Sequence, residues 1–156
     1  MTKDSSLIGA AGEHLVLSRL LSRGFLAAQA PRGSRKVDIL VNHLDGGEPF
    51  LIQVKARSGG GGQLGWHMSE KHETITDEDI FYTFVDFEPE HPDVYVLPAA
   101  TVAEVIRLDH ATWLNTPGKD GQAHNPTTFR RLRAASLGQK PGWLDAYLEH
   151  WDLLSR

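Results

Sequence analysis

Residues 51–62, LIQVKARSGGGG, contain the pattern that decides the fold class. Apolar side chains alternate with polar ones in this stretch: Ile52, Val54 and Ala56 against Gln53, Lys55 and Arg57. Successive side chains on a strand point to opposite faces of its sheet. The pattern therefore predicts a strand over residues 50–57 with one apolar face. Its other face carries an amide and a lysine side by side, just before a run of glycines.

The rest of the chain supplies further strands and helices around this one. We expect helices at 7–23 (ended by Gly24), 70–75, 99–108 (running on toward Trp113) and 143–154, and strands at 25–30, 37–41, 80–87 and 94–97. Residues 115–142 are rich in Gly, Pro and polar groups and are expected to wrap the surface. This order predicts an α/β domain, with a central mixed β-sheet flanked by helices, over residues 1–156.

Composition narrows the classes of protein that fit. The 156 residues carry a formal net charge of −4 and no cysteine, so disulfides and thiolate zinc sites are excluded. No apolar run is long enough to cross a bilayer, and the N-terminal residues lack a signal-peptide pattern. We therefore expect a cytoplasmic protein with no membrane partner. The negative charge argues against a strongly basic nucleic-acid coat protein, but it is compatible with a local basic patch.

Two carboxylates occupy unexpected places. Glu13 shares a helix stripe with Val16 and Leu20, which should face the sheet, and an unpaired buried carboxylate needs a cation or hydrogen bonds. A position near solvent, favoured by the helix dipole, is the alternative. Asp38 falls within a predicted strand, where aspartate is disfavoured. Its alternative is an edge position or a salt bridge with Arg35 or Lys36.

Taken together, these residues predict a metal site. Asp38 and Gln53 lie on strands joined by the 45–49 turn, so their side chains can meet. Mg²⁺ prefers hard oxygen ligands, here the Asp38 carboxylate, the Gln53 amide oxygen and the Val54 carbonyl. Lys55 can orient the attacking water or stabilise charge on a phosphate, and Glu13 reaches the same strands from its helix.

The motifs resemble those of a known superfamily. The run GEHLVLSRLLSRGF (12–25), the aspartate of VDILV (37–41) and QVKAR (53–57) are similar to the PD-(D/E)xK nucleases. The similarity is greatest to the branch with archaeal Holliday-junction resolvases and Mrr-type restriction endonucleases, which have an early helix Glu, a strand Asp and then E-x-K or Q-x-K. Downstream segments resemble a group of small bacterial proteins of this superfamily: 81–87, 94–106 and 116–132.

The resemblance implies a restriction-endonuclease-like core and an activity. That activity is the Mg²⁺- or Mn²⁺-dependent hydrolysis of DNA phosphodiester bonds, in restriction, repair or junction processing. Asp38 and Gln53 would be metal ligands, Lys55 the catalytic lysine and Glu13 an accessory acid. Cutting both strands of a duplex needs two sites, which is compatible with a homodimer.

Gln53 is a departure from the acid that most relatives carry, and it keeps a second function open. A neutral amide removes one negative charge from the site and weakens metal binding. The alternative is a nuclease-fold module with weak or no catalysis that binds nucleic acid or a partner protein.

Basic residues next to these motifs are candidates for DNA contacts. Arg32, Arg35 and Lys36 precede the Asp38 strand, and Arg57 follows Lys55, so the four can hold DNA phosphates at the mouth of the site. A solvated turn is the alternative. The segment FRRLR at 129–133 is a second basic spot, which we expect to be a solvated face. The 58–65 segment predicts a flexible loop.

Overall fold

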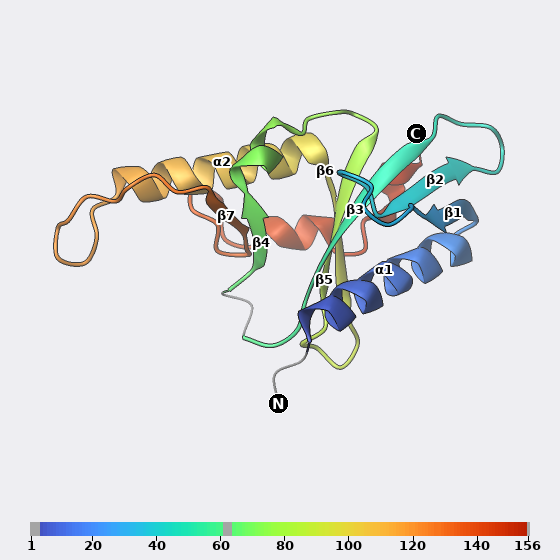
Figure 1. Ribbon diagram of the computed structural model, residues 1–156, viewed down its shortest axis with the longest axis horizontal. Coiled ribbons are helices and arrows are strands. Elements are labelled where there is room, and N and C mark those ends of the chain that lie inside the picture. The colour runs from blue at the N-terminus through green and yellow to red at the C-terminus, as the bar shows by residue number, and fades with distance from the viewer. Residues whose placement is uncertain (1–3, 61–63, 156) are drawn as a thin grey trace.

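The computed structural model describes residues 4–60 and 64–155, so Gly61, Gly62 and Gln63 of the predicted glycine loop lie outside the described residues (Figure 1). Its elements follow the order α1 (Ser5–Ser22), β1 (Phe25–Gln29), β2 (Ile39–His43), β3 (Phe50–Arg57), β4 (Trp66–Ser69), the 3₁₀ helix η1 (Glu70–Thr74), β5 (Ile80–Asp86), β6 (Asp93–Pro98), α2 (Ala99–Asn115), β7 (Phe129–Leu132), and the 3₁₀ helices η2 (Trp143–Tyr147) and η3 (Trp151–Leu154). The central mixed sheet flanked by helices is the fold class that the sequence predicts.

The main sheet has the strand order β1-β2-β3-β5-β6. The central strands β3 and β5 run parallel, with Lys55 opposite Phe84, whereas the other neighbouring strands run antiparallel. A parallel pair needs a crossover connection, and here β4 and η1 form it. This connection places η1 beside the polar face of β3.

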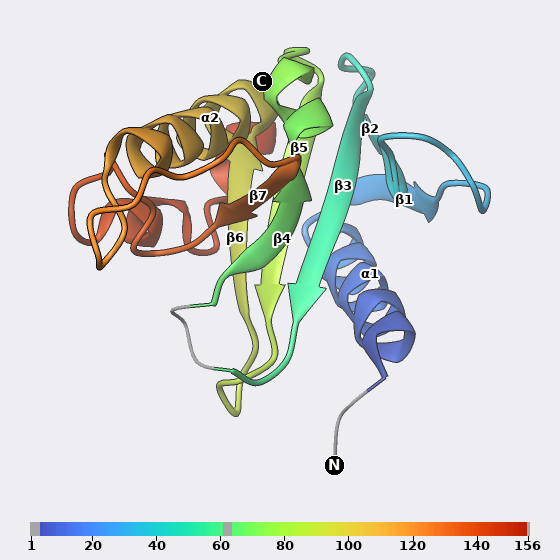
Figure 2. The same ribbon diagram turned by 60° about the vertical axis from the view of Figure 1, so that its left-hand side comes forward.

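Apolar and polar side chains alternate along β3, so they lie on opposite sides of the sheet, as expected. Val54 and Ala56 pack into the core on the α1 side, with Val16 and Leu20 of the helix. The helix comes closest to the strand at Gly12, where an added Cβ would stand 2.6 Å from the Ala56 Cβ. The other side of the sheet is covered by α2, η1 and β4 (Figure 2). Gln53 and Lys55 therefore face away from α1.

A small second sheet, not expected from the sequence, lies on that other side. The strands β4 and β7 pair antiparallel, with Trp66 opposite Leu132. The side chains that face the core are buried, including Met68, whereas Phe129 on the outer face is 43% exposed. Residues 115–142 thus do more than wrap the surface, because they contribute a strand.

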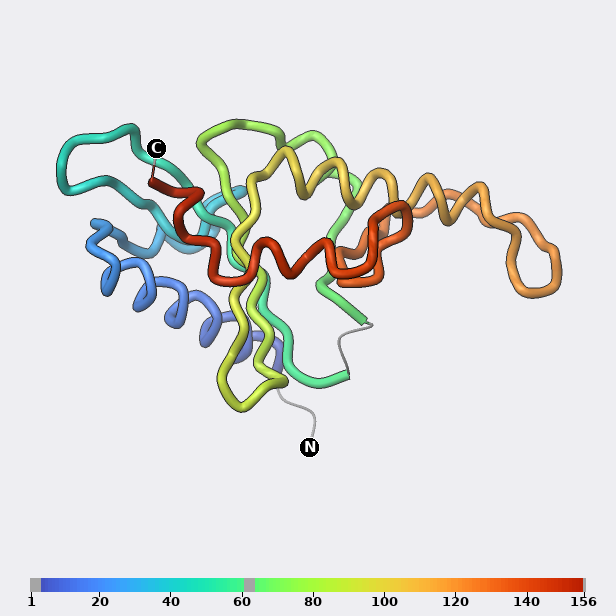
Figure 3. The backbone as a smooth tube through the Cα atoms, turned by 180° about the vertical axis from the view of Figure 1, so that it is seen from behind, coloured from blue at the N-terminus to red at the C-terminus, as the bar shows by residue number. Residues whose placement is uncertain are grey.

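The predicted helix at 143–154 is wrong. The structure has η2 and η3 there, and Leu148 between them forms a β-bridge with Tyr95. Glu149 adopts a φ of 50°, and its N–H donates to the Val94 carbonyl at 2.8 Å. This segment crosses β6 and satisfies part of its edge, which a continuous helix would leave unpaired (Figure 3). Trp151 is nevertheless buried, so the apolar stripe does reach the core.

The remaining differences are at element ends. The second strand begins at Ile39 instead of residue 37, so Asp38 immediately precedes it. In the described ranges, no helix combines the length and apolar character needed to span a bilayer.

Candidate active site

Asp38 lies at the point where β2 diverges from β3. Its backbone N–H still donates to the Ile52 carbonyl at 2.9 Å, as a strand residue would. The Oδ2 atom of the Asp38 carboxylate accepts a second hydrogen bond to β3, from the Val54 N–H at 2.7 Å. The N–H and C=O of one strand residue point to the same edge. The Val54 carbonyl therefore lies on the Asp38 side of β3, as the predicted ligand set requires.

Glu13 and Lys55 both interact electrostatically with Asp38. The Glu13 carboxylate accepts from the Gln29 amide at 3.3 Å, and its pKa is raised by burial and by the negative charge of Asp38. Burial lowers the pKa of Lys55. The negative charge of Asp38 raises this pKa in part, and the positive charge of Lys71 lowers it further. Three of the residues predicted from the sequence thus lie close enough to interact electrostatically, with Asp38 bound to the middle of β3.

A cavity of about 490 Å³, the cationic cleft, lies beside this point. It is lined by Ser34, Arg35, Lys36, Gln53, Lys55, Lys71, His72 and Ile75. These residues come from the 31–36 turn, β3 and the η1 segment. Four of them are cationic, so the cleft is suited to a polyanion. Lys36 has a φ of 66°, a left-handed conformation unusual for lysine, which fixes the turn at the mouth of the cleft.

Gln53 contributes an unusual atom to the cleft. Its Oε1 is buried and has no hydrogen-bond partner within residues 4–60 and 64–155. A buried oxygen without a donor is costly, and a bound cation or water would relieve that cost. The same described residues hold no cluster of three or more His, Asp or Glu side chains suited to a metal. The donors present are thus the Asp38 carboxylate, a neutral amide oxygen and a backbone carbonyl. That set fits Mg²⁺, which keeps several waters, better than a metal that needs a full protein cage.

Two predicted DNA-contact residues lie elsewhere. Arg57 forms a buried ion pair with Asp86, and its guanidinium stacks 4.8 Å from the centre of the Trp66 ring. This arrangement fastens β4 to the main sheet and favours a structural role. Arg32 is exposed and is near enough to Glu13 to affect its ionisation, but it does not line the cleft.

His72 and Lys71 are cleft residues that the sequence did not reveal. The His72 Nδ1 accepts the Ser69 backbone N–H at 2.9 Å, so the proton of the neutral ring is on Nε2. Burial and the charge of Lys55 lower the pKa of His72 to about 4. Both residues lie on η1, which reaches β3 only through the crossover after the glycine loop. No local pattern in the sequence signals that approach.

A solved structure shares this architecture. It is the bacterial homing endonuclease I-Ssp6803I, with a TM-score of 0.55 and 18% sequence identity over 98% of this chain and 92% of that chain. The two chains share a fold. No protein-family model matches the sequence, and no curated protein is significantly similar to it. The mixed α/β fold that the sequence predicts is confirmed, whereas membership of the PD-(D/E)xK superfamily and of its Mrr-type branch stays a prediction.

Proposed function

We propose that the protein is a metal-dependent endonuclease that hydrolyses phosphodiester bonds in DNA. The observation that carries this proposal is that the Asp38 carboxylate is hydrogen-bonded to Val54, the residue between Gln53 and Lys55, and that both of these line the cationic cleft. The fold shared with a homing endonuclease supports it. The ligand set and the lysine also agree with the pattern of the PD-(D/E)xK nucleases, to which we assign the chain within this proposal.

Each side chain then has a role set by its place. Arg35, Lys36 and Lys71 hold the phosphates of the DNA strand at the cleft. Lys55 places its ammonium beside Asp38, where it can orient a water or stabilise negative charge that builds on the phosphate. Glu13 serves as an accessory acid near Asp38, whose negative charge raises the pKa of Glu13.

Asp38, the Gln53 amide oxygen and the Val54 carbonyl would hold Mg²⁺ or Mn²⁺. When bound, such an ion supplies a Lewis acid and lowers the pKa of a coordinated water. With one formal charge among these ligands, we expect weak metal affinity in the absence of substrate. The DNA phosphate would complete the site. Cutting both strands of a duplex would require a second copy of the site, which a homodimer would supply.

A second function is a nuclease-fold module that binds nucleic acid without cutting it. The neutral Gln53 and the net charge of −4 favour this alternative. The placement of Lys55 favours the enzyme, because a cation on a partly buried strand face is costly and a binding surface needs no such group.

The test measures cleavage and metal binding in parallel. Duplex, single-stranded and branched DNA are incubated with the wild type, Asp38→Asn and Gln53→Glu, in Mg²⁺, Mn²⁺ or EDTA. An asparagine oxygen can still accept from the Val54 amide, so Asp38→Asn keeps the fold while it lowers metal affinity. Gln53→Glu should raise Mn²⁺ affinity in calorimetry, whereas Glu104→Gln on the exposed face of α2 should change nothing. If the wild type shows no metal-dependent cutting and Gln53→Glu creates none, the enzyme is excluded and the binding module remains.

A further inference from the structure

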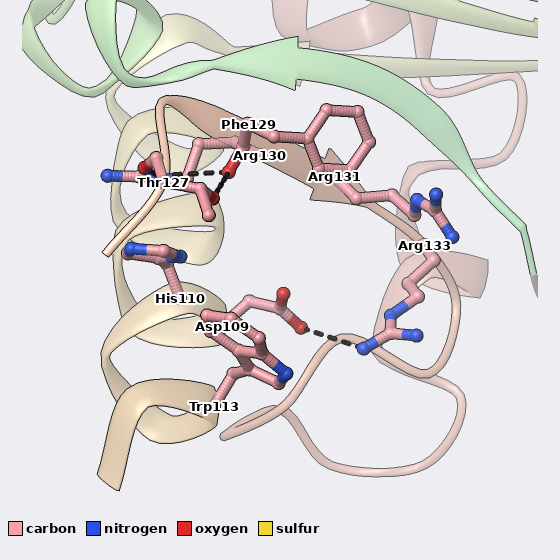
Figure 4. A pocket seen from close by; sticks show the side chains of 8 residues that line it. All are labelled: Asp109, His110, Trp113, Thr127, Phe129, Arg130, Arg131 and Arg133. Carbon is pink, nitrogen blue, oxygen red and sulfur yellow. Dashed lines mark hydrogen bonds and ion pairs between the residues drawn. The ribbon is translucent and has the colours of Figure 1, made fainter. Parts of the chain in front are cut away.

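A second cationic site, the arginine pocket, lies between the C-terminal half of α2 and the edge of β7 (Figure 4). Its volume is about 150 Å³. The side chains that carry the argument are Asp109, Trp113, Phe129, Arg130, Arg131 and Arg133. The pocket is separate from the cationic cleft and contains none of the residues assigned to catalysis. The segment expected to be a solvated basic face therefore forms the wall of a cavity.

Arg130 is a fixed part of this wall. Its guanidinium is paired with Glu73 and donates to the backbone carbonyls of Thr127 and Phe129. The side chain is only 8% exposed. Arg130 thus builds the pocket and ties β7 to η1, and three of its five N–H groups are already hydrogen-bonded within the protein.

Arg131 and Arg133 are less fully engaged. Arg131 stacks over the Phe129 ring, with 5.2 Å between the guanidinium carbon and the ring centre. Arg133 reaches Asp109 Oδ1 at 3.5 Å, although that oxygen also accepts from the Leu137 N–H at 2.6 Å. The Nε atoms of both arginines are buried and, within the part of the chain that the structure describes, have no hydrogen-bond partner. Buried guanidinium N–H groups without acceptors indicate a site for an anion.

Size and charge define the anion. Three arginines line the pocket, and only Arg130 and Arg133 are paired with carboxylates, those of Glu73 and Asp109, so the pocket keeps a positive excess. Pockets that enclose drug-sized ligands are about 300–1,000 Å³. The arginine pocket is too small for a free nucleotide, but it suits one phosphate group. The half-exposed Phe129 at its rim offers an aromatic surface to whatever is attached to that phosphate.

The pocket adjoins the cationic cleft through η1. Lys71 and His72 line the cleft, and the next residue, Glu73, holds Arg130 of the pocket. The η1 residues that line the cleft and the β7 residues that line the pocket belong to elements on the same side of the main sheet (Figure 2). A polyanion that occupies the cleft can therefore continue past η1 to the pocket.

We propose that the arginine pocket binds a phosphodiester group of the same DNA molecule that occupies the cleft. It thereby anchors the DNA at a second point, through Arg131 and Arg133. The inference rests on the proposed function, because DNA in the cleft is what brings the second phosphate to the pocket. The rim at Phe129 contacts the adjoining sugar or base.

The experiment measures DNA binding in EDTA, where no metal-dependent cleavage intervenes. Fluorescence anisotropy over a salt series compares the wild type with Arg131→Gln/Arg133→Gln. The matched control is Arg23→Gln at the end of α1, on the opposite side of the sheet. We expect the double variant to bind DNA more weakly and its log–log salt slope to fall by about one, the share of one phosphate contact. Arg23→Gln should leave the affinity and the slope as they are, and thermal unfolding checks that each variant is folded.

A second measurement looks at the arginines directly. In ¹⁵N-labelled wild-type protein, the Nε–H signals of Arg131 and Arg133 should shift when duplex DNA is added. Unmoved signals, or a salt slope equal to that of the wild type, would overturn the proposal. Signals that shift with inorganic phosphate but not with DNA would also overturn it, in favour of a free-anion site. If the wild type cuts no DNA but the pocket effect is present, the endonuclease function fails and the pocket stands. If the wild type cuts DNA but the double variant and the arginine signals show no effect, the endonuclease function stands and the pocket proposal fails.

Discussion

The carboxylate of Asp38 takes over a hydrogen bond that the backbone of β2 gives up, by accepting from the Val54 amide at 2.7 Å. The proposed metal ligand is therefore fastened to the strand that carries Gln53 and Lys55. Because the positions of all three depend on β3, they do not rely on a flexible loop for their geometry. Positioning of this kind is what electrostatic catalysis requires.

Replacing Lys55 by methionine should separate cleavage from binding. The change removes the charge but keeps the length of the side chain, and burial already disfavours the charged form, so the fold should be kept. Single-turnover cleavage should fall by about a hundredfold or more, the scale for losing one preorganised electrostatic group. Affinity for DNA in EDTA should change little. Lys71→Met, in the same cleft, is the control and should weaken binding more than it slows cleavage. Equal losses of both quantities in Lys55→Met would contradict its catalytic role.

The turn before β2 should hold DNA phosphates through some of its cations and not through others. Arg35 and Lys36 line the cleft, whereas Arg32 does not. We expect Arg35→Gln/Lys36→Asn to lower the salt slope of DNA binding by about one for each phosphate that is no longer neutralised. Asparagine is chosen at 36 because it tolerates the positive φ. Arg32→Gln should have a smaller effect in the same titration. A slope that none of these variants alters would identify the turn as merely solvated.

The close approach of α1 to β3 makes Gly12 a sensitive position. Gly12→Ala would place a Cβ 2.6 Å from that of Ala56, so the helix must move away from the strand. We expect the free energy of unfolding to fall by about 1–3 kcal/mol, as for other overpacked core positions. Cleavage should also slow, because Glu13 moves with the helix. Gly9→Ala is the matched control, since its added Cβ meets nothing within 4 Å apart from its chain neighbours and the backbone of its own helix, and it should be neutral or stabilising. Urea denaturation of the two variants measures the difference, and an equally stable Gly12→Ala would contradict the packing argument.

The buried His72 should make folding sensitive to acid. Its pKa is about 4 in the folded protein and about 6.5 when unfolded. Below pH 6.5 the unfolded chain binds a proton that the folded chain does not. The free energy of unfolding therefore has its full contribution from neutral His72 above pH 6.5. This contribution is lost as the pH falls toward 4, and the loss is at most about 3 kcal/mol. Unfolding of the wild type and His72→Gln across this range isolates the effect. Parallel pH profiles for the two proteins would show that His72 is not the cause.

Much of the fold could be predicted because it depends on local patterns. The alternation in residues 50–57 correctly placed Val54 and Ala56 on one face of the strand and Gln53 and Lys55 on the other, and the structure shows that α1 covers the apolar face. The acidic position Asp38 was found because aspartate is out of place in a strand. These are statements about neighbours in sequence, and strand geometry converts them directly into neighbours in space.

The missed features depend on contacts between distant residues. The pairing of β4 with β7 joins two four-residue strands about sixty positions apart, and neither is long enough to show a period. Arg130 was expected in solvent, but Glu73 and two backbone carbonyls hold it inside. The broken helix at 143–154 has helical spacing of its apolar residues, yet the open edge of β6 competes for its backbone. His72 joined the cleft by the same kind of non-local packing.

The segment that crosses β6 also has a consequence for the order of synthesis. The core on the α1 side includes Trp151 and Leu154, and Glu149 is paired with Arg19 of α1. Helix α1 therefore lacks part of its packing surface until the chain has been translated through residue 154. Until then β6 presents an unpaired edge, the feature by which strands associate between molecules. Ribosome-bound chains that end before residue 143 should depend on chaperones to avoid aggregation.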